Sequence, residues 1–222
     1  MNQTVSILKP KASNPSTNPP IDEVVRINIA AKRANALELL HAIADEHGSV
    51  TFANSFGAED MVLTDLILAE KLPIEIFSLD TGRLPAETYT LMGEVEKRYA
   101  TRLKVFFPDT TAVEQYVRTE GINAFYESVE LRKRCCAIRK VEPLRRALAG
   151  KQAWITGMRA AQSATRTELP VRQFDEANGL EKYNPLADWS EQDVWAYIRI
   201  HGVPYNALHD QFYPSIGCAP CT

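Results

Sequence analysis

The sequence predicts an α/β fold with a mostly parallel sheet and helices on both faces. Four short runs rich in β-forming residues, at 49–56, 72–80, 103–109 and 151–160, alternate with stretches of helical periodicity. Such alternation is typical of parallel sheets, because the connection between two parallel strands usually contains a helix. The length of 222 residues suits one domain of this class.

Apolar residues at helical spacing indicate where the helices lie. Between residues 22 and 46, Ala36, Leu40 and Ile43 recur on one face. A second apolar stripe follows the first β-rich run and consists of Val62, Leu63, Leu66 and Ile67.

Proline and capping residues mark further helix starts. Pro85 suits the first turn of a third helix. Pro143 is expected to start a new helix or to kink an existing one, within a helical run that ends at Leu148. Ser190 and Asp193 resemble a capping box at the start of the last clear helix.

The predicted domain covers residues 21–222 and follows an N-terminal arm. Residues 1–20 are dense in proline, serine and asparagine, so we expect this arm to be disordered. Residues 159–182 are polar and without clear periodicity, and they are interpreted as a long irregular loop.

The composition is that of an ordinary globular protein, with 24% charged and 45% hydrophobic residues. The net charge of −3 gives no electrostatic case for a nucleic-acid partner. No apolar run approaches the roughly 18 residues that span a membrane, and the N-terminus lacks the apolar core of a secretory signal. A cytoplasmic location is therefore expected. The oligomeric state is left open, and a homo-oligomer is compatible with the sequence.

The four cysteines form two close pairs, and these pairs are the strongest functional signal in the chain. Cys135 and Cys136 are adjacent, and Cys218 and Cys221 form a C-x-x-C at the end. A reducing compartment would keep these thiols free, and four thiolates suit one zinc ion or one iron–sulfur cluster. The adjacent pair is not the usual zinc spacing, which favours iron–sulfur; a zinc-stapled binding module is the alternative.

Three segments that follow predicted strands carry polar residues that could bind a nucleotide. In an open parallel sheet, ligands bind beyond the carboxyl ends of the strands. Taken singly, each segment is also compatible with an ordinary turn, and the first lacks the Walker A pattern. The candidate binding residues in these segments are Ser55, Gly57, Asp80, Thr81, Arg83, Gly157 and Arg159.

A basic run surrounds the first cysteine pair. Between residues 132 and 146, seven lysines and arginines stand against the single acid Glu142. Such runs are often solvated surface, but cations beside thiolates would offset the negative charge of a cluster. Arg139 and Lys140 are placed to bridge a cluster and an anionic substrate, and Lys140 is the candidate with an electrostatic catalytic role.

The ordered segments SFGAED, LDTGR, KRCCAIRK, GMRAAQSATR, NPLADWS and GCAPC resemble the assimilatory adenylylsulfate (APS) reductases of the PAPS/APS reductase family. The resemblance covers residues 22–222. It implies an adenine-nucleotide α-hydrolase-like, Rossmann-like fold. It also implies a 4Fe-4S cluster on Cys135, Cys136, Cys218 and Cys221, and APS bound by Ser55, the LDTGR segment and Arg159, with Lys140 near the phosphosulfate.

The resemblance further implies a reaction in sulfate assimilation and cysteine biosynthesis. A cysteine thiolate attacks the sulfur of APS, AMP leaves, and thioredoxin or a glutaredoxin-like dithiol protein releases sulfite from the enzyme thiosulfonate. Members of the family carry this cysteine in a tail after the cluster ligands, whereas these residues stop at Thr222. We therefore expect the 222 residues to bind nucleotide and cluster without turnover. Truncation is favoured over a naturally tail-less regulatory protein.

Two other enzymatic alternatives were weighed. PAPS reductases generally lack the cysteine pairs, which argues against that substrate. ATP-dependent adenylyltransferases favour S-G-G-x-D-S, and the SFGAED segment departs from it.

Overall fold

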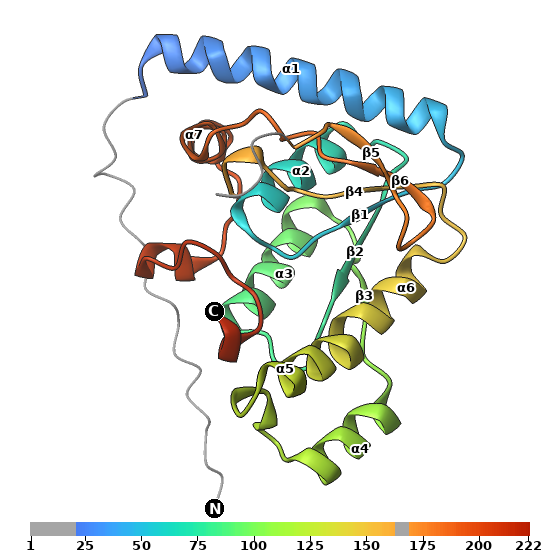
Figure 1. Cartoon of the computed structure of the whole chain (residues 1–222). Helices are drawn as coiled ribbons and strands as arrows, with labels where there is room; N and C mark the ends of the chain where they lie inside the picture. Colours follow the sequence, from blue (N-terminus) through green and yellow to red (C-terminus); the bar gives the residue numbers. More distant parts are fainter. Residues whose placement is uncertain (1–20, 163–168) are drawn as a thin grey trace, which may run out of the picture.

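A six-stranded mixed sheet forms the centre of the molecule, in the order β3-β2-β1-β4-β6-β5 (Figure 1). The computed structural model describes residues 21–162 and 169–222, so the predicted arm at 1–20 lies outside the described residues. The strands are β1 (Val50–Ala53), β2 (Glu75–Leu79), β3 (Lys104–Phe106), β4 (Ala153–Ile155), β5 (Arg172–Asp175) and β6 (Leu180–Tyr183). All neighbouring pairs are parallel except β5 with β6.

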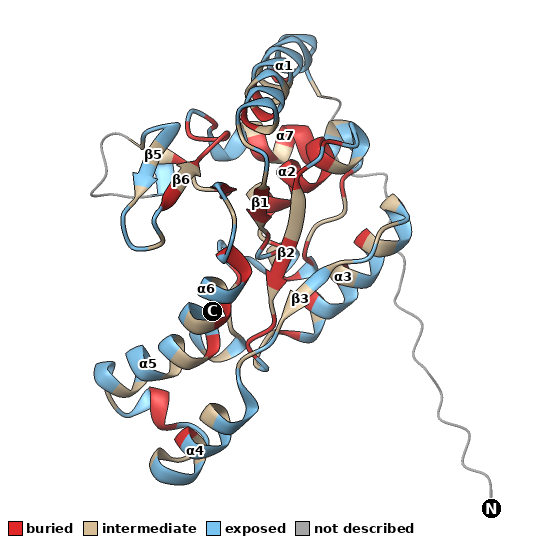
Figure 2. Cartoon of the chain, turned by 90° about the vertical axis from the view of Figure 1, so that its right-hand side faces the viewer, coloured by how far each residue is buried: buried red, intermediate tan, exposed pale blue. Residues whose placement is uncertain are grey.

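Helices lie on both faces of this sheet, as the sequence predicts (Figure 2). The helices are α1 (Glu23–Glu46), α2 (Ala58–Ala69), α3 (Ala86–Tyr99), α4 (Thr110–Glu120), α5 (Val129–Cys136), α6 (Glu142–Leu148) and α7 (Glu191–His201). Helices α1, α2 and α7 pack on one another on one face, whereas α6 contacts β2 and β3.

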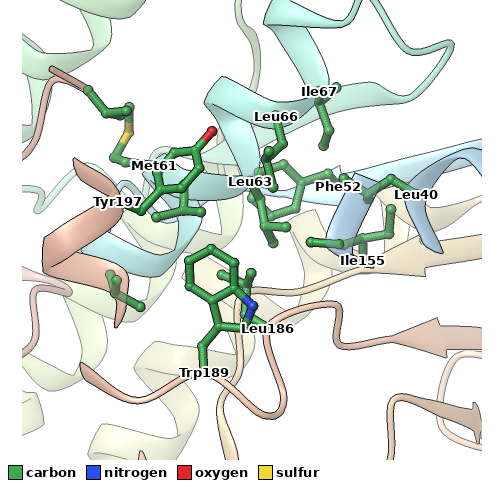
Figure 3. Packing of buried hydrophobic residues seen from close by; sticks show 14 of the residues in the cluster. Leu40, Phe52, Met61, Leu63, Leu66, Ile67, Ile155, Leu186, Trp189 and Tyr197 are labelled. Carbon is green, nitrogen blue, oxygen red and sulfur yellow. The ribbon is translucent and has the colours of Figure 1, made fainter. Parts of the chain in front are cut away.

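The core is divided by the sheet into two apolar clusters. Along β4, Ala153 and Ile155 belong to the larger cluster, which α1, α2 and α7 cover, whereas Trp154 belongs to the smaller one. This division follows from the strand geometry, because successive side chains point to opposite faces. Figure 3 shows the larger cluster, in which Phe52 of β1 packs beside Leu63 of α2.

The helix signals in the sequence are confirmed. Asp22 caps α1 by accepting from the N–H of Val24 at 2.9 Å. Ser190 and Asp193 form the predicted capping box of α7. Pro143 lies in the first turn of α6, directly after the π-helical segment that precedes this helix.

Two boundaries differ from the prediction. Pro85 precedes α3 as its N-cap residue and is not part of its first turn. A five-residue π-helical segment, Ala137–Val141, joins α5 to α6, so the run after the cysteine pair is one continuous helical path. The wide π turn places Arg139 in the interior at 8% exposure.

The interpretation of residues 159–182 as an irregular loop is wrong for its second half. Strands β5 and β6 form an antiparallel hairpin there. They escaped detection because β5 lies at the sheet edge, where polar residues are tolerated and Phe174 is 60% exposed. Residues 163–168 of this segment lie outside the described residues.

Within residues 21–162 and 169–222, no helix combines the length and apolar character that crossing a membrane requires.

Replacing Tyr197 by phenylalanine tests the buried polar contact between α2 and α7. The Tyr197 hydroxyl donates to Asp65 at 2.8 Å, and burial together with Asp65 raises the pKa of Tyr197. Tyr197→Phe leaves Asp65 short of one donor, so we expect a loss of roughly 1–3 kcal/mol in the free energy of unfolding. Tyr205→Phe is the control, because the bond from Tyr205 to Asp210 is exposed. Equal losses in urea titrations of the two variants would contradict this interpretation.

Candidate functional site

The carboxyl ends of β1 and β2 enclose a cavity of about 160 Å³ that brings several predicted site residues together. Ser55 follows β1 and Thr81 follows β2, and both line this cavity. Lys140 from the π-helical segment and Cys218 from the C-terminal turn close it on another side. Four predicted residues from four distant segments therefore meet at one edge of the sheet.

The loop after β1 directs its polar hydrogens inward. The main-chain N–H and the hydroxyl of Ser55 both donate to Asp60 Oδ2, at 2.7 and 2.6 Å. The N–H of Phe56 donates to Asn54 Oδ1 at 2.7 Å. Phe56 has a positive φ of 64°, a conformation that these hydrogen bonds hold in place. The N–H groups of Ser55 and Phe56 are thus already engaged and are not aimed at a phosphate.

A second cavity, of about 310 Å³, lies beyond the ends of β1 and β4 and also contacts Ser55. Gly57 and Gly157 line it. A Cβ atom on Gly157 would lie 2.2 Å from Asp60 Oδ1, so only glycine permits this approach of β4 to α2. Gly157 therefore shapes the cavity through its small size, whereas a Cβ atom on Gly57 would make only ordinary contacts.

The two acids in the first turn of α2, Glu59 and Asp60, have internal partners. Arg159 pairs with Glu59 at 2.7 Å, and its side chain is only 7% exposed. Arg159 lines a neighbouring cavity of about 400 Å³ that does not include Ser55. A direct contact between Arg159 and a nucleotide stays a prediction.

The side chains of the loop after β2 lie in different environments. Asp80 accepts from the N–H of Gly82 at 2.7 Å and from the Tyr89 hydroxyl at 2.9 Å, so it stabilises its own turn. Arg83 donates to the carbonyl of Ile122, and its guanidinium lies 4.7 Å from the ring centroid of Phe125. Arg83 thereby lines the cavity that holds the cysteines, whereas Thr81 faces the first cavity.

All four cysteines line a third cavity, of about 150 Å³. The C-terminal turn reaches it because the N–H of Ala219 donates to the carbonyl of Arg83 at 2.8 Å. Figure 1 shows this turn beside α5, the helix that ends at Cys136. Basic side chains share the wall of the cavity; they are Arg83, Arg132, Arg139 and Lys140.

The thiol donors of the third cavity are chemically compatible with zinc and with an iron–sulfur cluster. Within residues 21–162 and 169–222, no three histidine, cysteine or acidic side chains converge on one ion position. A zinc ion needs four ligands within about 2.3 Å, whereas the irons of a cluster each take their own thiolate. Four thiols around one cavity with basic walls have the donor chemistry that an anionic iron–sulfur cluster requires.

Several residues that shape the site were missed from the sequence. Asp60 gives no binding signal in the sequence, because its hydrogen bonds to Ser55 depend on the loop conformation. Phe125 gives no signal as a lone aromatic residue. The contact between Thr81 Oγ1 and Cys218 Sγ, at 3.2 Å, spans 137 positions of the sequence.

Comparisons with known proteins identify the family and the fold of this chain. The profile of the family described as the phosphoadenosine phosphosulfate reductase domain matches residues 49–222. The chain belongs to this family. The predicted membership in the PAPS/APS reductase family is thereby confirmed.

One curated relative is the adenosine 5′-phosphosulfate reductase of Allochromatium vinosum, 59% identical over 87% of this chain and 76% of the relative. The crystal structure of phosphoadenylyl-sulfate reductase from Candida auris, a phosphate complex, is 28% identical. It aligns with a TM-score of 0.74 over 91% of this chain and 98% of that chain. NMN synthetase from Francisella tularensis, 12% identical with a TM-score of 0.57 over 79% of this chain and 71% of that one, shares the fold. The predicted adenine-nucleotide α-hydrolase-like fold is confirmed.

The Asp60 carboxyl should make stability depend on pH. Burial raises its pKa to about 6, although hydrogen bonds from Ser55 oppose this change. Because the folded chain holds the proton more tightly than the unfolded chain, Asp60 stabilises the fold below about pH 4 and loses this effect by about pH 6. The difference in the free energy of unfolding between the wild type and Asp60→Asn should therefore fall by roughly 2 kcal/mol between pH 4 and 7. A pH-independent difference in denaturant titrations would contradict the assignment.

Proposed function

We propose that this protein reduces adenosine 5′-phosphosulfate to sulfite and AMP, with electrons from thioredoxin or a similar dithiol protein. The proposal rests on one observation, which is that two cavities share residues in their walls. Lys140 and Cys218 line both the cavity at the ends of β1 and β2 and the cavity of the four cysteines. A nucleotide bound at the sheet edge would thus end beside the cysteines and their cations.

The proposed reaction is a substitution at sulfur followed by thiol exchange. A thiolate attacks the sulfur, the bond from sulfur to the phosphate oxygen breaks, and AMP leaves with the electron pair. The reductant then attacks the sulfur of the resulting thiosulfonate cysteine and releases sulfite. Its second thiol displaces the enzyme thiolate and leaves an oxidised reductant, so the two electrons balance.

The attacking thiolate and the phosphosulfate are both negative, so the site must supply positive charge. Lys140 has no hydrogen-bond or ion-pair partner among the residues that the structure describes, and it is exposed. Its ammonium group is therefore available to the anion. Arg139 differs, because its guanidinium donates to the carbonyl of Thr81 at 2.6 Å and is buried.

We propose that Cys135, Cys136, Cys218 and Cys221 hold a 4Fe-4S cluster. When bound, such a cluster would organise and polarise the site without passing electrons to the nucleotide. Because all four cysteines of the chain are then ligands, the attacking thiol must come from outside these 222 residues. The reaction would serve sulfate assimilation and cysteine biosynthesis in the cytoplasm, where thioredoxin keeps thiols reduced.

PAPS reduction is the second candidate, because the Candida auris structure carries that name. The cysteine pairs argue for APS, by the resemblance to the cluster-binding members. Titration with APS and PAPS separates the two, and tighter binding of PAPS would reverse the choice.

Metal analysis tests the cluster. We expect about four irons and four sulfides per chain after anaerobic purification, with absorption in the visible range. Cys218→Ser should lower both contents sharply. Stoichiometric zinc in a colourless protein would contradict the cluster.

Replacing Lys140 by alanine tests the anion-binding role. Loss of a hydrogen bond to a charged group should weaken APS binding roughly tenfold or more. Lys133→Ala is the matched control, because Lys133 is an exposed lysine of the same basic run that lines neither cavity. Iron content should stay unchanged in both variants. Equal affinities of the two variants for APS would remove Lys140 from the site.

A further inference from the structure

Ser55 lies where the two cavities at the sheet edge adjoin, and the direction of its hydroxyl is fixed. It lines both the cavity between β1 and β2 and the one beyond β4. Its oxygen lies 2.6 Å from Asp60 Oδ2, and the main-chain N–H of Ser55 donates to the same carboxylate oxygen at 2.7 Å. Asp60 is itself buried at 7% exposure, so it holds Ser55 from inside the fold.

This arrangement determines which hydrogen-bond role Ser55 can offer a ligand. A hydroxyl has one proton and two lone pairs, and an ionised carboxylate can only accept. The proton of Ser55 is therefore directed at Asp60, and only lone pairs remain for a group in the cavity. A phosphate or sulfate oxygen, which also accepts, gains no hydrogen bond there, whereas a sugar hydroxyl can donate to Ser55.

The neighbouring hydrogen bonds and charges also disfavour an anion beside Ser55. The N–H of Phe56 is bonded to Asn54, whose amide in turn donates to Thr64 at 2.9 Å, so Asn54 cannot turn away. Asp60 adds negative charge behind Ser55, while the charge of Glu59 is paired with Arg159. Among the described residues that line the first cavity, Lys140 is the cation, and it has no ion-pair partner there.

We propose that Asp60 is a positioning residue that fixes Ser55 as a hydrogen-bond acceptor for a ribose hydroxyl of the nucleotide. The sugar then lies against Ser55, and the phosphosulfate extends toward Lys140. This orientation rests on the proposed function, since it takes an adenosine nucleotide as the ligand. Asp60→Asn weakens the constraint, because a neutral amide oxygen at the position of Oδ2 is a poorer acceptor for the serine proton than a carboxylate.

Binding of AMP and of its 2′-deoxy, 3′-deoxy and corresponding fluoro analogues tests the assignment. Calorimetric titrations of the iron-loaded protein at pH 8, where Asp60 is ionised, would compare wild type, Ser55→Ala and Asp60→Asn. Ser190→Ala is the matched control. Its N–H and hydroxyl also donate to one aspartate oxygen, Asp193 Oδ2, both at 2.8 Å, but Ser190 lines none of the three cavities. Thermal unfolding checks that each variant is folded.

We expect the loss of one of the two hydroxyls to weaken binding to the wild type and to Ser190→Ala roughly threefold to tenfold. The fluoro analogue at that position should bind no better, because fluorine cannot donate. In Ser55→Ala, removal of the same ligand hydroxyl should leave the affinity unchanged. In Asp60→Asn, its removal should lower the affinity by a smaller factor than in the wild type. If Asp60→Asn fails to fold, the Ser55→Ala comparison still decides.

If Ser55→Ala lowers the affinity for AMP and for both deoxy analogues by the same factor, the inference is overturned and the proposed function stays intact. Full binding of the fluoro analogue would also overturn it, because Ser55 would then be a donor. A folded wild type that binds no AMP would overturn both the inference and the proposed function.

Discussion

The attachment of the C-terminal turn to the loop after β2 is the contact on which the whole site depends. The N–H of Ala219 donates to the Arg83 carbonyl, and Thr81 Oγ1 lies 3.2 Å from Cys218 Sγ. Through these contacts the second cysteine pair reaches the first across more than 80 positions of the chain. The same loop follows a strand of the parallel sheet, so one short segment borders both the cavity at the sheet edge and the cavity of the cysteines.

Charge is distributed unevenly around this contact. The chain as a whole carries −3, yet the cysteine cavity is lined by three arginines and one lysine. Most of the arginines near the site are already engaged, as Arg139 is with Thr81 and Arg159 with Glu59. Lys140 differs from them because it is exposed at the boundary of two cavities. A site for two anions needs such a cation, whereas the buried arginines chiefly hold the loops in position.

Much of the fold follows from local rules in the sequence. The alternation of strands and helices predicted the parallel sheet, and Ser190 with Asp193 predicted the start of α7. The hairpin of β5 and β6 was missed because polar residues predominate in β5 and lie side by side in β6, so both strands lack the apolar alternation that identifies a half-buried strand. The cysteine pairs were found because their spacing is rare.

Side-chain directions could not be predicted in the same way. Arg83 packs over Phe125 and Arg159 pairs with Glu59, and the sequence signals neither contact; binding of a nucleotide by either arginine stays a prediction. These directions depend on partners far away in the sequence. Asp60 shows that even a partner five positions away can escape notice, because its bond to the hydroxyl of Ser55 depends on the conformation of the loop.

Anomalous diffraction at the iron edge, from crystals of the iron-loaded protein soaked with AMP, tests the central claim most directly. We expect iron density enclosed by Cys135, Cys136, Cys218 and Cys221, with the nucleotide at the ends of β1 and β2 and its phosphate toward Lys140. Iron absent from this cavity, a single zinc ion on the C-x-x-C alone, or a nucleotide bound away from Lys140 would contradict the coupling of the two cavities.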